Sequence, residues 1–181
     1  MKKKAFITGI AGQDGSYLAE YLLSLNYDVY GIARRNSVPE NQQTRLDNIR
    51  RDINVTYGDL LDVGCVQKAL DEIQPDEIYN LAAQSHVRVS YDVPEFTVQT
   101  NALGVLNILN AYLRSCPSAK FYQASSSEMF GLSVDEDNFQ RETTSMNPVS
   151  PYGCSKVFGY NIVRNFRRAY KLHSCNGILF N

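Results

Sequence analysis

The stretch FITGIAGQDGSYLAEYLL, residues 6–23, decides the fold of this chain. Its first residues are apolar and read as a short buried strand, and its last residues repeat Leu, Ala and Tyr at helical spacing. Gly9, Gly12 and Gly15 stand between the two elements. Such glycines permit a tight turn, let the backbone approach a pyrophosphate, and bring helix and strand close together, while the helix N-terminus supplies N–H donors. The stretch therefore predicts a dinucleotide-binding turn, although glycines at one strand–helix turn can also be purely structural.

The same alternation of short apolar runs and helix-period segments continues along the chain. Loops rich in polar residues fall at 34–43 and 135–150. Because crossovers between such strands are right-handed, we expect an α/β fold with a doubly wound parallel sheet of Rossmann type, forming one cofactor-binding domain over residues 1–181. The strands are predicted at 4–9, 28–33, 53–58, 76–82, 119–125 and 175–180, and the helices at 16–26, 62–73, 95–115 and 152–170.

The composition argues against several classes of function. The 181 residues are 44% hydrophobic and carry a net charge of −1, which suffices for one core and gives no basic surplus for binding nucleic acid. The four cysteines and two histidines show neither metal-ligand nor disulfide spacing, so we expect no metal site and reduced thiols. The sequence shows no signal-peptide pattern and no run of about 20 apolar residues that would span a membrane. We expect a soluble cytoplasmic protein.

The segment after the second predicted strand distinguishes between two cofactors. Sheets that bind NAD usually place an acidic residue here to hold the ribose hydroxyls, but the sequence GIARRNS offers Arg34 and Arg35. A carboxylate would repel the 2′-phosphate of NADP, whereas guanidinium groups bind a phosphate through paired, charge-assisted hydrogen bonds. The two arginines favour NADP, and two solvated loop residues are the alternative interpretation.

The sequence SPYGCSKVFGY contains a candidate catalytic pair. Tyr152 and Lys156 lie four residues apart, so on a helix they share one face. A lysine ammonium beside a phenol favours the phenolate, and we expect it to lower the pKa of Tyr152. Tyr and Lys recur at this spacing in many helices. The prediction therefore depends on their place after the fifth strand, whose carboxyl end carries Ser126 where ligands of such sheets bind.

In order and spacing, the motifs resemble those of the extended short-chain dehydrogenases/reductases and, within them, the GDP-mannose 4,6-dehydratases. The continuation Gln13-Asp14-Gly15-Ser16-Tyr17 is specific, because sister sugar-nucleotide enzymes usually carry a Phe-Ile-Gly version of this loop. The resemblance covers nearly the whole chain and implies binding of NADP and of a nucleotide sugar. Its segments are TGIAGQDGSYLAEYLL, YGIARRNS, YGDL, EIYNLAAQSHV, FYQASSSEMFG, PVSPYGCSKVFGY and NGILFN.

The resemblance implies a role for each matching position. The catalytic residues would be Ser126, Glu128, Tyr152 and Lys156, and the substrate would contact Ser85, Ser126, Glu128, Tyr152 and Asn181. The family usually has threonine at the position of Ser126, and Phe96 stands where related sequences can have a tyrosine that reaches the cofactor. The cofactor would contact Gly9, Ile10, Ala11, Gly12, Gln13, Asp14, Arg34, Arg35, Asn36, Ser37, Asp59, Leu60, Leu81, Ala82, Ala83, Gln84 and Ser85, as well as Tyr152 and Lys156.

The resemblance also implies a reaction that explains the acid in FYQASSSEMFG. Tyr152 would take the proton of the hydroxyl on carbon 4 of the hexose while a hydride passes to NADP, and the resulting ketone acidifies the hydrogen on carbon 5. Glu128 would remove that hydrogen as a proton and help the hydroxyl on carbon 6 to depart, after which the hydride returns to carbon 6. An epimerase or a reductase needs no second base. Glu128 is therefore the discriminating residue, and a surface charge at a helix start is its alternative interpretation.

Several points stay open at the level of sequence. The same motifs would serve a dehydratase or an epimerase acting on another nucleotide sugar, and a non-catalytic NADP-binding module would keep the fold without turnover. The family continues beyond the position of Asn181 into a smaller domain that grips the substrate nucleotide, so we expect that domain to be absent here and the 181 residues alone need not be active. The helix matching 152–170 contributes to subunit pairing in the family, which implies a homo-oligomer.

Overall fold

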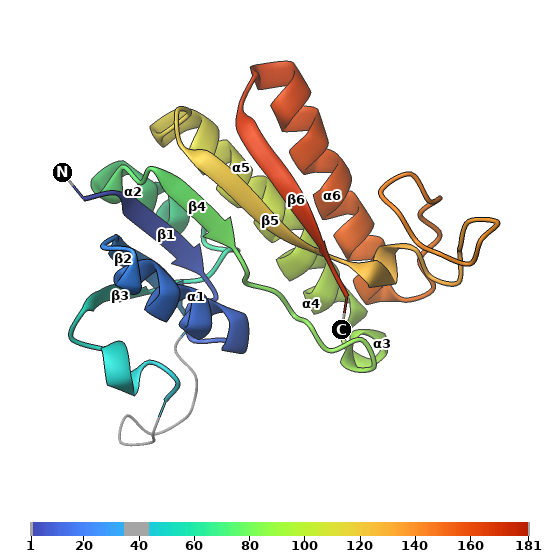
Figure 1. Cartoon of the computed structure of the whole chain (residues 1–181), viewed down its shortest axis with the longest axis horizontal. Coiled ribbons are helices and arrows are strands. Elements are labelled where there is room, and N and C mark those ends of the chain that lie inside the picture. Colours follow the sequence, from blue (N-terminus) through green and yellow to red (C-terminus); the bar gives the residue numbers. More distant parts are fainter. Residues whose placement is uncertain (1, 35–43, 181) are drawn as a thin grey trace.

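The computed structural model describes residues 2–34 and 44–180. Its six strands are parallel and form one sheet in the order β3-β2-β1-β4-β5-β6 (Figure 1). The strand order reverses between β1 and β4, as it does in doubly wound sheets. All six predicted strands are present: β1 (Lys4–Thr8), β2 (Asp28–Ala33), β3 (Ile53–Tyr57), β4 (Glu77–Asn80), β5 (Lys120–Ser126) and β6 (His173–Leu179).

Helices cover both faces of the sheet, which confirms the predicted α/β class. Buried residues of α2, α5 and α6 pack on one face, around Phe6, Ile78 and Phe121. The opposite face carries α1, whose buried Ala19 and Leu22 pack over β1 and β2. The long helices are α1 (Gln13–Ser24), α2 (Val63–Ile73), α5 (Gly104–Ser115) and α6 (Pro151–Tyr170), and short 3-10 turns occur at η1 (Asp47–Ile49) and η3 (Ser127–Met129).

The helix predicted at 95–115 is not one regular helix. It is divided into α4 (Pro94–Val98), a π-helical segment η2 (Gln99–Leu103) and α5, and a further short helix, α3 (Val89–Asp92), precedes it. Within η2, the side chain of Asn101 exchanges two hydrogen bonds with the backbone of Gln84, each 2.9 Å long. This contact joins segments far apart in sequence, so hydrophobic periodicity does not predict it.

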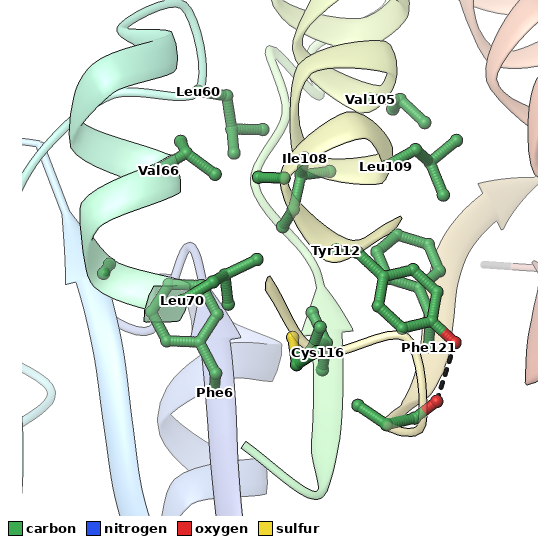
Figure 2. Packing of buried hydrophobic residues seen from close by; sticks show 14 of the residues in the cluster. Phe6, Leu60, Val66, Leu70, Val105, Ile108, Leu109, Tyr112, Cys116 and Phe121 are labelled. Carbon is green, nitrogen blue, oxygen red and sulfur yellow. Dashed lines mark hydrogen bonds between the residues drawn. The ribbon is translucent and has the colours of Figure 1, made fainter. Parts of the chain in front are cut away.

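The largest cluster of buried side chains lies between the sheet and the α2–α5 layer (Figure 2). Val66 and Leu70 of α2 meet Ile108 of α5, and all three are fully buried. Tyr112 stacks on Phe121 of β5 with ring centroids 5.6 Å apart. Burying side chains of this size stabilises a fold by about 1.5–3 kcal/mol each, so this layer contributes much of the stability. Among the described residues, no helix combines the length and apolar composition needed to cross a bilayer.

Replacing Tyr112 by Phe should lower the free energy of unfolding by about 1–2 kcal/mol, because a buried carbonyl loses its donor. The Tyr112 hydroxyl donates to the carbonyl of Ala119 over 2.6 Å, and the residue is fully buried. Urea unfolding at constant pH measures the change. The control is Tyr21→Phe, since Tyr21 is 61% exposed and should change stability by less than about 0.5 kcal/mol. Equal losses of stability for Tyr112→Phe and Tyr21→Phe would contradict the role given to the Tyr112 hydroxyl.

Candidate active site

The candidate site lies where the parallel strands end at one edge of the sheet. Strand register places Thr8 of β1 level with Asn80 of β4, and Asn80 level with Gln123 of β5. After these residues, the connection that follows β1 crosses one face of the sheet and the connection that follows β4 crosses the other. The two connections therefore separate at this edge. A cleft of about 580 Å³ opens at this edge, the usual ligand position in a doubly wound fold.

Two glycines shape the turn between β1 and α1. Gly9 has a φ of +69°, and a Cβ atom there would lie 2.9 Å from the backbone of Ala82, so a side chain is excluded by both conformation and space. At Gly15, a Cβ atom would overlap the carbonyl oxygen of Gly9. The helix α1 starts after Gly12 without a side-chain cap, which leaves its first N–H groups available. An open helix N-terminus beside this cradle fits the pyrophosphate of a dinucleotide.

Most of the residues predicted to contact the cofactor line this cleft. Ile10 and Gln84 do not, and Arg35, Asn36 and Ser37 lie outside the described residues, as does Asn181, which was predicted to contact the substrate. The predicted residues in the cleft wall are Gly9, Ala11, Gly12, Gln13, Asp14, Arg34, Asp59, Leu60, Leu81, Ala82, Ala83 and Ser85.

The side chains of Ile10 and Gln84 contact other parts of the protein instead of lining the cleft. The side chain of Ile10 is fully buried in the core on the α1 side, in a space that the absence of a side chain at Gly31 provides. The Gln84 Nε2 atom donates to the Thr97 hydroxyl and to the His86 carbonyl, each over 3.2 Å. The Gln84 Oε1 atom accepts from the backbone N–H of His86 over 2.6 Å. The Gln84 side chain therefore shapes the loop after β4 and does not reach into the cleft.

The four predicted catalytic side chains, Ser126, Glu128, Tyr152 and Lys156, all line the cleft. Ser126 ends β5, and its Oγ accepts a hydrogen bond of 3.2 Å from the N–H of Glu128 at the start of η3. The first turn of α6 packs closely on η3, since a Cβ atom at Gly153 would lie 2.7 Å from the carbonyl oxygen of Glu128. This contact brings the half-buried Glu128 to the same site as Tyr152.

The start of α6 is fixed by its own sequence and by α3. Ser150 is the N-cap, and its Oγ accepts from the N–H of Gly153 over 3.0 Å. Pro151 occupies the first helical position, where its missing N–H costs nothing. The N–H of Tyr152 donates to the buried hydroxyl of Ser90 over 3.3 Å. The first turn of α6, which carries Tyr152, is therefore fixed both by its own N-cap and by α3.

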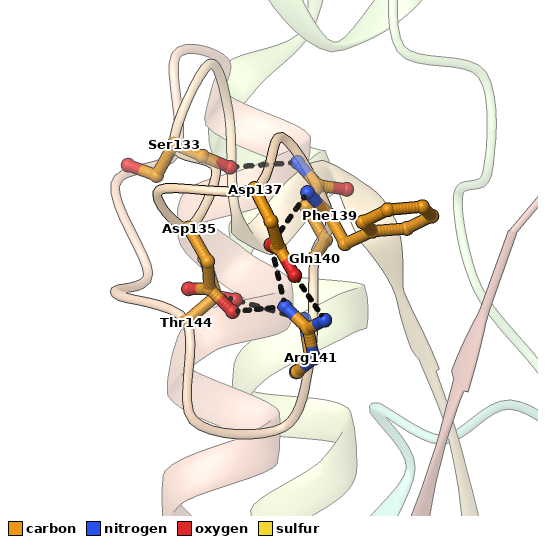
Figure 3. Close-up of polar contacts among 7 residues, drawn as sticks. All are labelled: Ser133, Asp135, Asp137, Phe139, Gln140, Arg141 and Thr144. Atoms are coloured by element: carbon orange, nitrogen blue, oxygen red, sulfur yellow. Dashed lines mark hydrogen bonds and ion pairs between the residues drawn. The ribbon is translucent and has the colours of Figure 1, made fainter.

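Side-chain contacts order the segment that joins η3 to α6. Met129 and Phe130 are fully buried, which anchors its start and explains why apolar residues follow Glu128. Further along, the Arg141 guanidinium donates to the carboxylates of Asp135 (2.9 Å) and Asp137 (2.8 Å) (Figure 3). Single exposed ion pairs contribute little, but two carboxylates on one guanidinium close this loop on itself before α6 begins.

A buried hydrogen-bonded chain crosses β1, β4 and β5 beneath the cleft. The N–H of Ala82 donates to the Thr8 hydroxyl over 3.1 Å, and that hydroxyl donates to Asn80 Oδ1 over 2.5 Å. The Asn80 amide donates to Gln123 Oε1 over 2.7 Å, and the Gln123 amide donates to the carbonyl of Ala124 over 3.0 Å. Every member of the chain is paired, which is the arrangement that makes buried polar groups tolerable.

Lys156 lies at the end of this chain. Its Nζ donates to the Ala124 carbonyl over 2.9 Å, and the residue is 6% exposed. It forms no ion pair with any residue in the described ranges. Burial lowers the pKa of Lys156 to about 8, because the ammonium loses hydration. The ammonium lies 5.5 Å from the ring centroid of Tyr152, so the two members of the predicted pair are adjacent.

The pKa of Tyr152 is raised above its ordinary value, so the expectation that it would be lowered is wrong. Burial of the phenol is the largest cause, a hydrogen bond with the Ser126 side chain acts in the opposite direction, and the charge of Glu128 adds to the rise. Loss of hydration disfavours the phenolate more than its surroundings favour it. The influence of Glu128 also means that its carboxylate lies within electrostatic reach of the phenol.

Sequence reasoning missed part of the cleft wall. Thr8, Ala33 and Gly58 lie beside predicted segments, and extending each segment by one residue would have included them. No sequence motif marks Val87 or Thr100 as a binding residue. Val87 lies in an irregular loop, and Thr100 lies inside a predicted helix. The other lining residues that were not predicted to bind are Gly15, Ile32, Ala124, Ser125 and Leu179.

The buried lysine predicts a distinctive pH dependence of stability. The pKa of Lys156 is about 8 in the folded chain against 10.5 as its ordinary value, so between these values the unfolded chain binds more protons. Stability relative to Lys156→Met should therefore rise by roughly 3 kcal/mol as the pH increases through this window, and stay level below it. Urea unfolding of both proteins at several pH values measures the difference. Lys120→Met, which removes an exposed lysine, is the control, and a flat difference for Lys156→Met would refute the prediction.

Comparison with known proteins agrees with this geometry. The family model described as GDP-mannose 4,6 dehydratase matches residues 6–181. The GDP-mannose 4,6-dehydratases of Vibrio cholerae and Homo sapiens are 49% and 48% identical to the chain, over 100% and 98% of its length and 50% and 49% of theirs. The chain thus spans about half the length of the curated relatives it matches.

A solved structure carries the same fold. The structure of DesIV, a dTDP-glucose 4,6-dehydratase from Streptomyces venezuelae with NAD and TYD bound, has a TM-score of 0.82 and 25% identity, over 96% of this chain and 54% of that one. The match of the fold, together with a family model that covers all but the first five residues, determines where this sequence belongs. The chain belongs to the GDP-mannose 4,6-dehydratase family.

Proposed function

We propose that residues 1–181 form the cofactor-binding domain of an NADP-dependent lyase that converts GDP-mannose to GDP-4-keto-6-deoxymannose. The observation that carries the proposal is the convergence of Glu128, Tyr152 and Lys156 in one cleft beside the glycine turn. An epimerase needs the phenol and the lysine, but only a dehydratase needs a second base. The relatives named GDP-mannose 4,6-dehydratase support the choice of sugar nucleotide.

Each reactive side chain has a task that its position allows. Tyr152, held at the first turn of α6, takes the proton from the hydroxyl on carbon 4 of the hexose. Ser126 lines the same cleft as the phenol and would orient that hydroxyl of the sugar. Lys156 places positive charge beside the phenol ring, which offsets part of the cost of forming a phenolate there. When bound, NADP would accept the hydride from carbon 4 and later return it to carbon 6, while carbon 5 takes back a proton.

Glu128 carries the step that separates a dehydratase from its sister enzymes. Once carbon 4 is a ketone, the hydrogen on carbon 5 is acidic and a carboxylate within reach can remove it. The protonated Glu128 can then donate to the hydroxyl that leaves carbon 6. Its half-buried position at the cleft, rather than in bulk solvent, suits both transfers.

A dehydratase acting on another nucleotide sugar is the second candidate. The Streptomyces neighbour is named for dTDP-glucose, so this arrangement of strands and helices accompanies more than one nucleotide. Incubating the complete gene product that contains this sequence with GDP-mannose and with dTDP-glucose, and detecting a 4-keto-6-deoxy product by mass spectrometry, separates the two. No turnover of GDP-mannose alongside turnover of dTDP-glucose would reject the first candidate.

The proposal extends to assembly and location. Phe96, Leu103 and Phe158 are 37%, 47% and 41% exposed on α4, η2 and α6, which supports a homo-oligomer paired through these helices. Sedimentation velocity tests this, and a monomer at every concentration would contradict it. The four cysteines are free thiols, which supports a reducing, cytoplasmic compartment. Thiol labelling of the protein in intact cells tests the compartment, and extensive disulfide formation would contradict it.

Replacing Glu128 by Gln should reduce dehydration at least 100-fold and leave the Kd for NADP within about twofold, because general-base contributions are of order 10²–10⁴. The amide keeps the shape of the side chain and removes the base. Turnover is measured in the complete gene product and binding by titration calorimetry. Glu142→Gln removes an exposed carboxylate outside the cleft and is the control. Loss of cofactor binding together with turnover would show that Glu128 is misassigned.

Replacing Arg34 by Gln should weaken NADP binding about tenfold or more and leave NAD binding within about threefold, because only NADP carries the 2′-phosphate and a hydrogen bond to a charged group contributes about 1.5–3 kcal/mol. The Arg34 guanidinium lies at the cleft, 5.6 Å from the ring centroid of Phe96, which limits where it can point. Arg50→Gln, which removes an exposed arginine elsewhere, controls for net charge. Equal losses for both cofactors would remove the role given to Arg34.

A further inference from the structure

The π-helical segment η2 carries a hydroxyl without a partner. Thr100 is 5% exposed, and its Oγ1 is shielded from solvent. Across residues 2–34 and 44–180, it is the one buried side-chain nitrogen or oxygen that has no hydrogen-bond partner. Buried polar atoms in proteins are nearly always paired, so an exception calls for a ligand or another explanation.

The surroundings of Thr100 are fixed by well-paired neighbours. One turn earlier, the Thr97 hydroxyl donates to the Val93 carbonyl over 2.9 Å and accepts from the Gln84 amide over 3.2 Å. The next residue, Asn101, exchanges two hydrogen bonds with the Gln84 backbone. Thr97 and Asn101 are therefore both tied to Gln84, whereas Thr100 between them is not.

Thr100 lies on the wall of the cleft. The helix that follows η2 touches the loop after β3, since a Cβ atom at Gly104 would lie 3.0 Å from Leu60. The segment also touches α6, since a Cβ atom at Gly159 would lie 3.4 Å from the Asn101 carbonyl oxygen. Thr100 therefore lies between Leu60 and the helix that carries Lys156, and all three line the same cleft.

A threonine in a helix has two accessible χ1 rotamers, and a rotation between staggered positions can exchange its hydroxyl with its methyl group. Such a rotation can turn the shielded oxygen toward the cleft without moving the backbone. π-helical turns frequently occur at functional sites. The unpaired hydroxyl and the π-helical turn thus both indicate a ligand-binding role for Thr100 in the cleft.

We propose that Thr100 is a further cofactor-binding residue, whose hydroxyl turns into the cleft and hydrogen-bonds an oxygen of the ribose–pyrophosphate middle of a bound dinucleotide. The inference rests on the proposed dinucleotide-binding function. A hydroxyl both donates and accepts, so it can pair with a ribose hydroxyl or a phosphate oxygen. These groups are common to NAD and NADP. The role of Thr100 therefore differs from that of Arg34, which concerns the 2′-phosphate alone.

Titration calorimetry of Thr100→Val with NADP and with NAD tests the proposal, because valine keeps the shape and removes the hydroxyl. The full chain should bind both cofactors about tenfold or more weakly, by the same factor. The free protein should unfold at the same temperature or higher, since no protein hydrogen bond is lost. Thr100→Ser keeps the hydroxyl and should bind within about threefold of the unchanged chain. Thr97→Val, which does break protein hydrogen bonds, should instead lower the unfolding temperature.

Each other outcome has a distinct meaning. Thr100→Val binding as tightly as the unchanged chain would overturn the inference and leave the cofactor proposal standing. A loss confined to NADP would also overturn it, because the contact would then involve the 2′-phosphate. A fall in unfolding temperature equal to that of Thr97→Val would show that the hydroxyl has a protein partner. Failure of the unchanged chain to bind either dinucleotide would overturn the proposed function itself, and the role of Thr100 with it.

Discussion

A buried ammonium is the constraint on which the cleft edge of this fold depends. A charged group removed from water needs a strong acceptor, and Lys156 is paired with the carbonyl of Ala124 rather than with a carboxylate. That carbonyl is available because β4 ends at Asn80, level with Gln123, so the next residue of β5 has no strand beside it on that side. The early end of β4 therefore opens the cleft and also supplies the acceptor for the lysine.

The same constraint ties the reactive end of the cleft to the glycine turn. The chain of hydrogen bonds that reaches the Ala124 carbonyl starts at the N–H of Ala82, whose backbone lies against Gly9. The side chains of Thr8, Asn80 and Gln123 in this chain are buried, and each depends on the next for its partner. Removing one leaves its neighbours unsatisfied, which costs more than the single bond. The turn that fits a pyrophosphate and the helix that bears the lysine are thus connected through one chain of hydrogen bonds.

The sequence predicted those features that depend on local pattern and missed those that depend on partners from elsewhere. Strand positions followed from apolar runs, and the glycine spacing and the resemblance placed Tyr152, Lys156 and Glu128 at a common edge because parallel strands end together. The break in the helix predicted at 95–115 depends on contacts with Gln84, a residue of another segment. The direction of the Tyr152 pKa depends on burial, which the Tyr–Lys spacing does not encode.

The electrostatic coupling between Glu128 and Tyr152 has a consequence for the order of the proposed reaction. An ionised Glu128 raises the pKa of the phenol, so two adjacent anions are disfavoured. In the proposed reaction, a Tyr152 phenolate would take the proton of the hydroxyl on carbon 4 and become a neutral phenol, which leaves the carboxylate as the single anion at the site. Glu128 would then be the remaining anionic base when the hydrogen on carbon 5 becomes acidic. The two bases therefore act best in sequence, oxidation before elimination, which is the order that the chemistry requires.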